Sequence, residues 1–362
     1  MNVTMDQLGF NEAFERAFLA QNEDDCRPAR VVEAQRELYT LHTGDREILG
    51  AVSGVFAHNA SARSEFPVVG DFVSVRLEEG QHRAIIRNVL PRRSQFSRKI
   101  AGETTEEQVL AANVDTAFLV QSLNRDFNVR RLERYLILAW ESGAAPVIVL
   151  TKSDLCADVD AKIAEATSVG MGAPVCAVSA QTGNGLEALE AYLTVGQTAV
   201  VLGSSGAGKS TLVNALYGGS VQKTFAVRSS DDRGKHTTTA RQLILMPAGG
   251  MIIDTPGMRE LQLWNGSDGM AQVFADVEEW ARDCRFRDCG HDHEPGCAVQ
   301  AALADGRLDR ERLASFRKLQ RELAYLARKE DRHAQIAEQK RWKRATESGR
   351  ERRLLKGRQD SP

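Results

Sequence analysis

The stretch TAVVLGSSGAGKSTLVNAL, residues 198–216, runs from an apolar segment through a glycine-rich turn into a helical pattern. Its centre, GSSGAGKS from Gly203 to Ser210, has the spacing G-x-x-x-x-G-K-[ST]. Glycines let successive backbone N–H groups turn inward around phosphate oxygens, and the helix that follows adds partial positive charge at its N-terminus. We therefore predict a phosphate-binding loop between a strand and a helix.

Within this loop two side chains have distinct expected roles. Lys209 is expected to reach the β- and γ-phosphates of a nucleotide, and Ser210 to ligate Mg²⁺. The full set of expected nucleotide contacts from the loop is Gly203, Ser204, Ser205, Gly206, Ala207, Gly208, Lys209, Ser210 and Thr211.

Strand and helix patterns alternate around the loop. Apolar runs at 114–123, 145–154 and 173–180 predict strands, and the patterns at 129–142 and 186–193 predict helices. This rhythm indicates an α/β domain with a mostly parallel sheet covered by helices on both faces. Ligand contacts should come from loops at the carboxyl ends of its strands.

Beyond the loop, DTPG at 254–257 follows the apolar run MIID. Asp254 can reach the Mg²⁺ shell there, and the N–H of Gly257 can meet the γ-phosphate. The polar segment between the phosphate loop and DTPG, SSDDRGKHTTTARQ at 229–242, has the composition of a switch loop that orders around Mg²⁺ and a γ-phosphate. Thr237 or Thr238 is the expected metal contact, with Thr238 the choice. A solvated loop without a ligand is the alternative.

Base recognition is expected from two loops that precede the phosphate loop. TKSD at 151–154 follows VIVL and resembles the N-K-x-D element, whose aspartate pairs with the guanine N1–H and 2-amino groups. SAQTGNG at 179–185 resembles the loop that backs the base. The contacts expected here are Thr151, Lys152, Ser153, Asp154, Ser179 and Ala180.

Together these loops favour GTP over ATP. A P-loop ATPase or kinase is the alternative, and it would show no guanine preference. Thr151 stands where asparagine is commonest, so we expect the loss of an amide link between loops and looser nucleotide binding.

The order of the motifs, at 151, 179, 203, about 236 and 254, differs from that of most GTPases, in which the phosphate loop comes first. A circular permutation explains the order, since new termini in a surface loop leave strands and contacts intact. It also places the segment after DTPG directly before a cluster of cysteines and histidines.

That cluster, DCRFRDCGHDHEPGC at 283–297, predicts one structural zinc ion per chain. The expected ligands are Cys284, Cys289, His291 and Cys297, spaced C-x4-C-x-H-x5-C. His293 is an alternative to His291, because spacing alone does not fix the geometry. Reduced cysteines without a metal are a further alternative.

Changes in pattern along the chain divide it into parts. Short, partly alternating runs separated by turn residues predict a β-barrel of OB-fold type at 30–100, although a small sandwich fits almost as well. The polar segment 95–108 is expected to be a bridge. The remaining expected parts are an N-terminal extension at 1–29, the permuted α/β domain at 101–268, a zinc-binding helical domain at 269–330 and a basic tail at 331–362.

Composition bounds the partners. The net charge is only −2, so nucleic-acid binding must come from local features such as the tail, whose basic residues can also be a solvated face. No run approaches the twenty apolar residues of a spanning helix, and the start lacks a targeting pattern. We expect a cytoplasmic protein without a membrane partner, and a monomer.

With this motif order, GDFV at 70–73, LPRRSQFSRK at 90–99, KHTTT at 235–239 and the Cys/His spacing, the chain resembles the RsgA (YjeQ) family from about residue 30 to 330. The resemblance implies a GTPase, binding GTP and GDP, that acts late in maturation of the small ribosomal subunit. It further implies that the barrel and zinc module contact ribosomal RNA and that the subunit promotes hydrolysis. A GTP-gated RNA-binding chaperone with incidental hydrolysis is the alternative.

The catalytic residue is a separate question, because Met258 follows DTPG where Ras-like GTPases carry a water-orienting glutamine. A thioether cannot orient water. His236, beside the switch threonines, is the expected substitute, since an imidazole can orient or deprotonate water near neutral pH. The family likeness supports this role, and a merely solvated His236 is the alternative.

Overall fold

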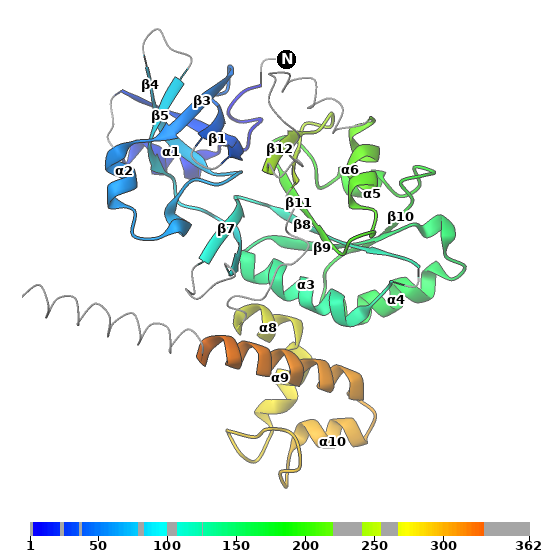
Figure 1. Ribbon diagram of the computed structural model, residues 1–362. Helices are drawn as coiled ribbons and strands as arrows, with labels where there is room; N and C mark the ends of the chain where they lie inside the picture. The colour runs from blue at the N-terminus through cyan, green and yellow to red at the C-terminus, as the bar shows by residue number, and fades with distance from the viewer. Residues whose placement is uncertain are drawn as a thin grey trace, which may run out of the picture.

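The computed structural model describes residues 3–21, 25–35, 38–78, 83–99, 107–124, 126–219, 241–254 and 267–328. Figure 1 shows a β-barrel, an α/β region and a helical C-terminal region following one another along the chain. The expected site residues His236, Thr237, Thr238 and Gly257, and the tail at 331–362, lie outside the described residues. Among the helices of the described ranges, none has the length and apolar character to cross a membrane.

The barrel is built from β1 (Cys26–Gln35), β2 (Leu38–His42), β3 (Glu47–Val52), β4 (Phe72–Leu77) and β5 (Arg83–Val89). The strand order β1-β2-β3-β5-β4 closes on itself because β4 also pairs with β1, and β3 runs parallel to β5. Val31, Leu41 and Ile86 are fully buried inside it. Closure removes the sheet edges, so the OB-type barrel is confirmed over the sandwich. Short helices α2 (Gly54–Asn59) and η1 (Arg63–Glu65) lie between β3 and β4.

The α/β region has the sheet order β10-β9-β8-β11-β13-β12. All neighbouring strands are parallel except β12 with β13. The strands are β8 (Thr116–Ser122), β9 (Ala145–Thr151), β10 (Val175–Val178), β11 (Thr198–Gly203), β12 (Arg241–Leu245) and β13 (Met251–Asp254). The expected mostly parallel sheet is therefore present, and its outermost strand is β10, from the middle of the chain.

Helices cover both faces of this sheet (Figure 1). They are α3 (Val129–Ser142), α4 (Val159–Gly170), the 3-10 turn η2 (Ser153–Leu155), α5 (Glu187–Glu190) and α6 (Lys209–Tyr217). Alternation along β8 separates the two cores: Leu119 packs in the cluster that contains Leu136 of α3, and Phe118 in the one that contains Leu212 of α6. Of the helix expected at 186–193, only α5 (Glu187–Glu190) forms. The chain then turns through Gly196, at φ 80°, into β11.

The polar segment at 95–108 is not a simple bridge, and that expectation is wrong. Its ends form the antiparallel strands β6 (Gln95–Lys99) and β7 (Glu107–Ala112). Phe96, Val109 and Ala111 of these strands are buried, so the apolar alternation outweighs the polar composition between them. Strand β1 also pairs with β12, with Glu33 opposite Gln242, which makes the barrel and the α/β sheet continuous.

Arg30 lies where the N-terminal segment, the barrel and the α/β region meet. Its guanidinium donates to the carbonyls of Leu8, Gly70 (3.3 Å) and Asn113 (3.3 Å), and to Thr198 Oγ1 (2.9 Å). The side chain is 1% exposed, and burial lowers the pKa of Arg30 to about 10, so it stays charged at neutral pH. The N-terminal residues thus belong to the packed structure, with α1 (Glu12–Leu19) burying Phe14 against Phe72.

The C-terminal region contains α8 (Ser267–Val273), α9 (Ala275–Arg282), α10 (Ala298–Ala304) and a helix over residues 310–328. Val277, Phe274 and Phe316 belong to the same buried cluster as Leu132 and Leu136 of α3. The region therefore packs on the face of the sheet that α3 covers, as Figure 1 shows.

Replacing Arg30 tests whether this junction stabilises the fold. In Arg30→Met, three carbonyls and a hydroxyl lose their donor, so we expect the free energy of unfolding to fall by about 3 kcal/mol. Arg27, exposed on the same strand, supplies the control: Arg27→Met should change it by less than about 0.5 kcal/mol. Urea denaturation measures both, and equal effects would contradict this role for Arg30.

Candidate functional site

The phosphate loop joins β11 to α6, as its sequence predicts. Lys209 Nζ donates to the carbonyls of Gly203 (2.7 Å) and Ser204 (2.6 Å), which holds the loop curved over the start of α6. Gly208 has φ 92°, in the left-handed region, and a Cβ at position 203 would lie 2.4 Å from the Val120 carbonyl oxygen. Glycine is thus required at both positions, by backbone conformation at one and by close approach at the other.

The base-recognition loop lies directly against the phosphate loop. Thr151 Oγ1, at the end of β9, donates to the Ala207 carbonyl (2.6 Å), and Lys152 Nζ donates to the Gly206 carbonyl (2.9 Å). An amide link is absent here, as expected, but the Thr151 hydroxyl joins the two loops in its place. Asp154 lies exposed in η2, next to this junction.

The other described site residues come from neighbouring strand ends. Ser179 follows β10, which pairs with β9, and Asp254 ends β13, which pairs with β11. Ser179 is buried, and its hydroxyl accepts from the Thr182 N–H (3.2 Å), which shapes the loop containing Ala180. Ser210 and Thr211 lie exposed in the first turn of α6. The sheet therefore collects these residues at one edge.

Sequence reasoning missed Asp126, which also contacts the phosphate loop. Its Oδ2 accepts from Ser204 Oγ (2.8 Å) and Arg131 Nη1 (2.7 Å). These hydrogen bonds, that from Arg131 foremost, lower the pKa of the Asp126 carboxyl. The signal available was its position shortly after β8, whose carboxyl end lies at the same sheet edge.

The four cysteine and histidine side chains predicted to bind a metal come together. Cys284 Sγ and Cys297 Sγ lie 3.8 Å apart, each is 3.6 Å from His291 Nδ1, and the ligand atoms of the group, including Cys289, lie within 4.8 Å of one another. Tetrahedral ligands at metal distances of about 2.0–2.3 Å are separated by roughly 3.5–3.8 Å, so the donor set fits a metal ion. His293 is exposed and lies outside the group.

Neighbouring residues fix the orientation of His291. Its carbonyl accepts from Gln300 Nε2 and Arg317 Nη2, and its φ of 59° turns the chain sharply. Burial, with the nearby positive charge of Arg317, lowers the pKa of the imidazole, which favours the neutral form that ligates metals. Arg317 lies in the 310–328 helix, so the cluster is attached to the helical region around it.

These features define a class: a P-loop nucleotide hydrolase with a guanine-type base loop, permuted motifs and a metal-binding helical module.

Comparison with known proteins narrows the class. The family model described as RsgA GTPase matches residues 89–264. The chain is 45% identical to the small ribosomal subunit biogenesis GTPase RsgA of Opitutus terrae, with 98% of this chain and all of that protein covered. It is 46% identical to RsgA 1 of Oceanobacillus iheyensis, over 87% of this chain and 90% of the relative.

Two solved structures share the fold. The crystal structure of YjeQ from Thermotoga maritima has a TM-score of 0.63 and 27% identity, with 83% of this chain and 99% of that chain covered. YloQ, described as a circularly permuted GTPase, has a TM-score of 0.59 at 24% identity, over 83% of this chain and 96% of that chain. The chain belongs to the RsgA family of circularly permuted GTPases, and it is a GTP hydrolase.

The hydroxyl of Thr151 can be tested for its role in joining the two loops. Thr151→Val keeps the shape and leaves the Ala207 carbonyl without its donor, a loss of roughly 1.4 kcal/mol, so the Kd for GDP should rise about tenfold. Thr151→Ser keeps the hydroxyl and should bind GDP nearly as tightly as the unchanged protein. Calorimetric titration gives the three values, and unchanged affinity in Thr151→Val would contradict the role.

Proposed function

We propose that this protein binds the small ribosomal subunit late in its maturation and hydrolyses GTP there, with the subunit stimulating hydrolysis. The observation that carries the proposal is the bonding of the TKSD loop to the phosphate loop through Thr151 and Lys152, which builds a guanine nucleotide site from permuted segments. Full-length relatives named for small ribosomal subunit biogenesis support the partner.

The site residues divide the recognition of GTP among them. Lys209, the first residue of α6, donates to a β- or γ-phosphate oxygen of the bound nucleotide. Ser210 and Thr238 would hold Mg²⁺, and the ion would supply positive charge against the phosphates. Asp154 pairs with guanine, Asp254 serves the Mg²⁺ shell, and the N–H of Gly257 is the proposed donor to the γ-phosphate.

For the chemical step, His236 is the residue that we propose orients the attacking water. The position after DTPG is Met258, which has no hydrogen-bonding group able to do so. A neutral imidazole can accept a hydrogen bond or a proton from water.

The surfaces for RNA are proposed on the barrel and the helical module. Phe286 is 41% exposed in the Cys/His loop, and the Arg285 guanidinium lies 5.5 Å from its ring centroid. An exposed aromatic ring beside arginine suits base stacking and phosphate binding. On the barrel, Arg46, Arg76 and Arg83 are exposed, and the basic tail adds further positive charge. A cytoplasmic location and a monomeric state fit this partner.

We further propose that the metal is zinc, bound by Cys284, Cys289, His291 and Cys297 in a closed structural site. Three thiolates and one imidazole match its preference for sulfur and nitrogen ligands. Elemental analysis should find about one zinc ion per chain. Cys297→Ser should lose it, whereas Cys176→Ser, outside the cluster, should keep it, and equal zinc content in both variants would exclude this ligand set.

The function is tested by measuring GTP hydrolysis with and without small ribosomal subunits. We expect stimulation of at least about a hundredfold, because a bound partner can complete the set of catalytic groups around the γ-phosphate. His236→Ala should bind GTP and subunits normally but lose most of the stimulated rate, since general-base roles contribute about 10²–10⁴-fold. Thr167→Ala, exposed on α4 and outside the proposed RNA surfaces, is the control. Absent stimulation, or full activity in His236→Ala, would overturn the proposal.

A further inference from the structure

The first turn of α3 is bonded to the phosphate loop through Asp126. Arg131 donates to both Asp126 oxygens, at 2.7 and 3.1 Å, and the same carboxylate accepts from Ser204 Oγ at 2.8 Å. A two-pronged guanidinium–carboxylate pair fixes orientation as well as distance. The position of Ser204 is thus tied to the position of α3.

The same turn is bonded to the C-terminal helical region through Glu133, whose side chain is fully buried. Glu133 Oε1 accepts from Arg130 Nη1 (2.7 Å) and from Arg312 Nη1 (2.8 Å), and Oε2 accepts from Ser315 Oγ (2.5 Å). Arg312 and Ser315 both lie in the 310–328 helix.

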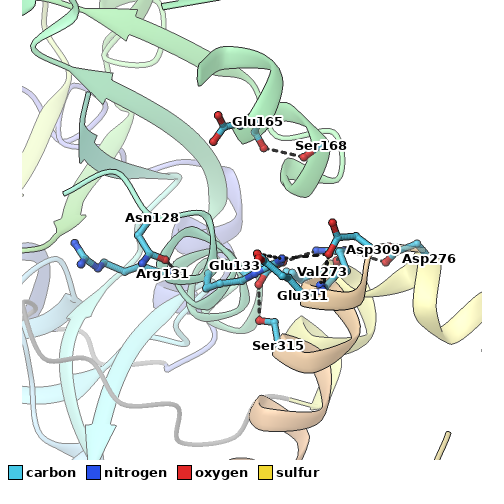
Figure 2. Close-up of polar contacts among 12 residues, drawn as sticks. Asn128, Arg131, Glu133, Glu165, Ser168, Val273, Asp276, Asp309, Glu311 and Ser315 are labelled. Atoms are coloured by element: carbon cyan, nitrogen blue, oxygen red, sulfur yellow. Dashed lines mark hydrogen bonds and ion pairs between the residues drawn. The ribbon is translucent and has the colours of Figure 1, made fainter. Parts of the chain in front are cut away.

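Arg312 extends the connection into the preceding helices. It donates to Asp276 of α9 through Nε and Nη2, both at 2.8 Å, and to the Val273 carbonyl at the end of α8 (2.6 Å). Figure 2 shows Glu133 directed toward Ser315 and Asp276, while Arg131 extends on the other side of the helix. One helical turn is therefore linked to the phosphate loop through Asp126 and, through Glu133 and Arg312, to three helices of the C-terminal region.

Burial makes this second connection sensitive to small displacements. Glu133 and Arg312 have 0% and 7% exposed side chains, and charges removed from water are stable only while their partners keep good geometry. A shift of α3 would leave a buried charge without its full set of partners. A displacement of α3 is therefore passed on to the 310–328 helix through the bonds of Glu133.

We infer that Asp126 is a positioning residue for the phosphate loop, and that the first turn of α3 couples nucleotide binding to the packing of the C-terminal helical region. The inference rests on the proposed nucleotide site. Coupling between two sites is reciprocal, so a change at Glu133 alters nucleotide affinity, and nucleotide alters the stability of the helices around Arg312.

A double-mutant cycle tests the first half, using a fluorescent GDP analogue and the full-length protein. We expect the Kd to rise about fivefold in Asp126→Ala and about threefold in Glu133→Gln, which does not touch the loop. The Kd of the double variant should stay about fivefold above that of the unchanged protein. Once Asp126 is removed, the effect of Glu133 can no longer reach the phosphate loop. Unchanged affinity in Glu133→Gln, or effects that multiply, would overturn the inference.

Arg134→Gln is the matched control. Arg134 pairs with Glu322 (2.5 Å) and so also joins α3 to the 310–328 helix, but this pair is partly exposed. The hydrogen bonds of Arg134 within the described residues go to Glu322 and not to Glu133 or Asp126. Its Kd should equal that of the unchanged protein. If the unchanged protein fails to bind GDP at all, the proposed nucleotide site fails, which is a different outcome from additivity.

Amide hydrogen exchange tests the reciprocal half. Saturating GDP should slow exchange in α9 and in residues 310–328 by about threefold, the same factor that Glu133 contributes to affinity. In Glu133→Gln the slowing should disappear, and Arg312→Lys, which keeps the charge but not the fork of donors, should reduce it. Slowing that survives in both variants would show that α3 is not the connection.

Discussion

Parallel strands present their carboxyl ends at a single edge of the sheet, and this constraint brings together the loops of the proposed nucleotide site. Strands β9, β10, β11 and β13 end in the base loop, the Ser179 loop, the phosphate loop and Asp254. The edge is fixed by strand order in space and not by order along the chain. Permuting the motifs therefore leaves the site intact, and it directs the chain after β13 into the helical region instead of back into the sheet.

Buried charges join the parts that the permutation creates. Arg30 binds the N-terminal segment, barrel and α/β region together, and Arg312 with Glu133 joins α3 to the helices that carry the Cys/His cluster. Such charges cost desolvation free energy and contribute stability only in one arrangement. They therefore favour a single relative placement of the parts.

The fold was largely predictable because its signals are local. The phosphate loop, the strand patterns and the Cys/His spacing each depend on neighbouring residues, and the structure gathers the described residues at the sheet edge and in the cluster as expected. The choice of His291 over His293 as the fourth ligand could be settled only by the structure, since both histidines lie at spacings that allow metal binding. The hairpin of β6 and β7 was missed because its polar centre hides the buried alternation of Phe96 and Val109.

Contacts between distant segments were the least predictable. Thr151 reads as a departure from the usual asparagine, yet its hydroxyl reaches Ala207, 56 residues away. Asp126 and Arg30 carry no motif, and their roles depend on partners brought close only by folding. Their residue types are compatible with exposed positions, so sequence pattern alone assigns them no role.

In the proposed nucleotide site, permuted loops come together and the Asp154 carboxylate accepts hydrogen bonds from guanine. The most direct measurement is hydrolysis of GTP, ATP and XTP by the unchanged protein and by Asp154→Asn. Xanthine carries a carbonyl where guanine carries the 2-amino group. The side-chain amide of asparagine can donate to that carbonyl, whereas the carboxylate of aspartate has no donor. We expect the unchanged protein to hydrolyse GTP but neither ATP nor XTP, and Asp154→Asn to lose activity on GTP and gain activity on XTP. Equal use of ATP and GTP, unaffected by the substitution, would contradict it.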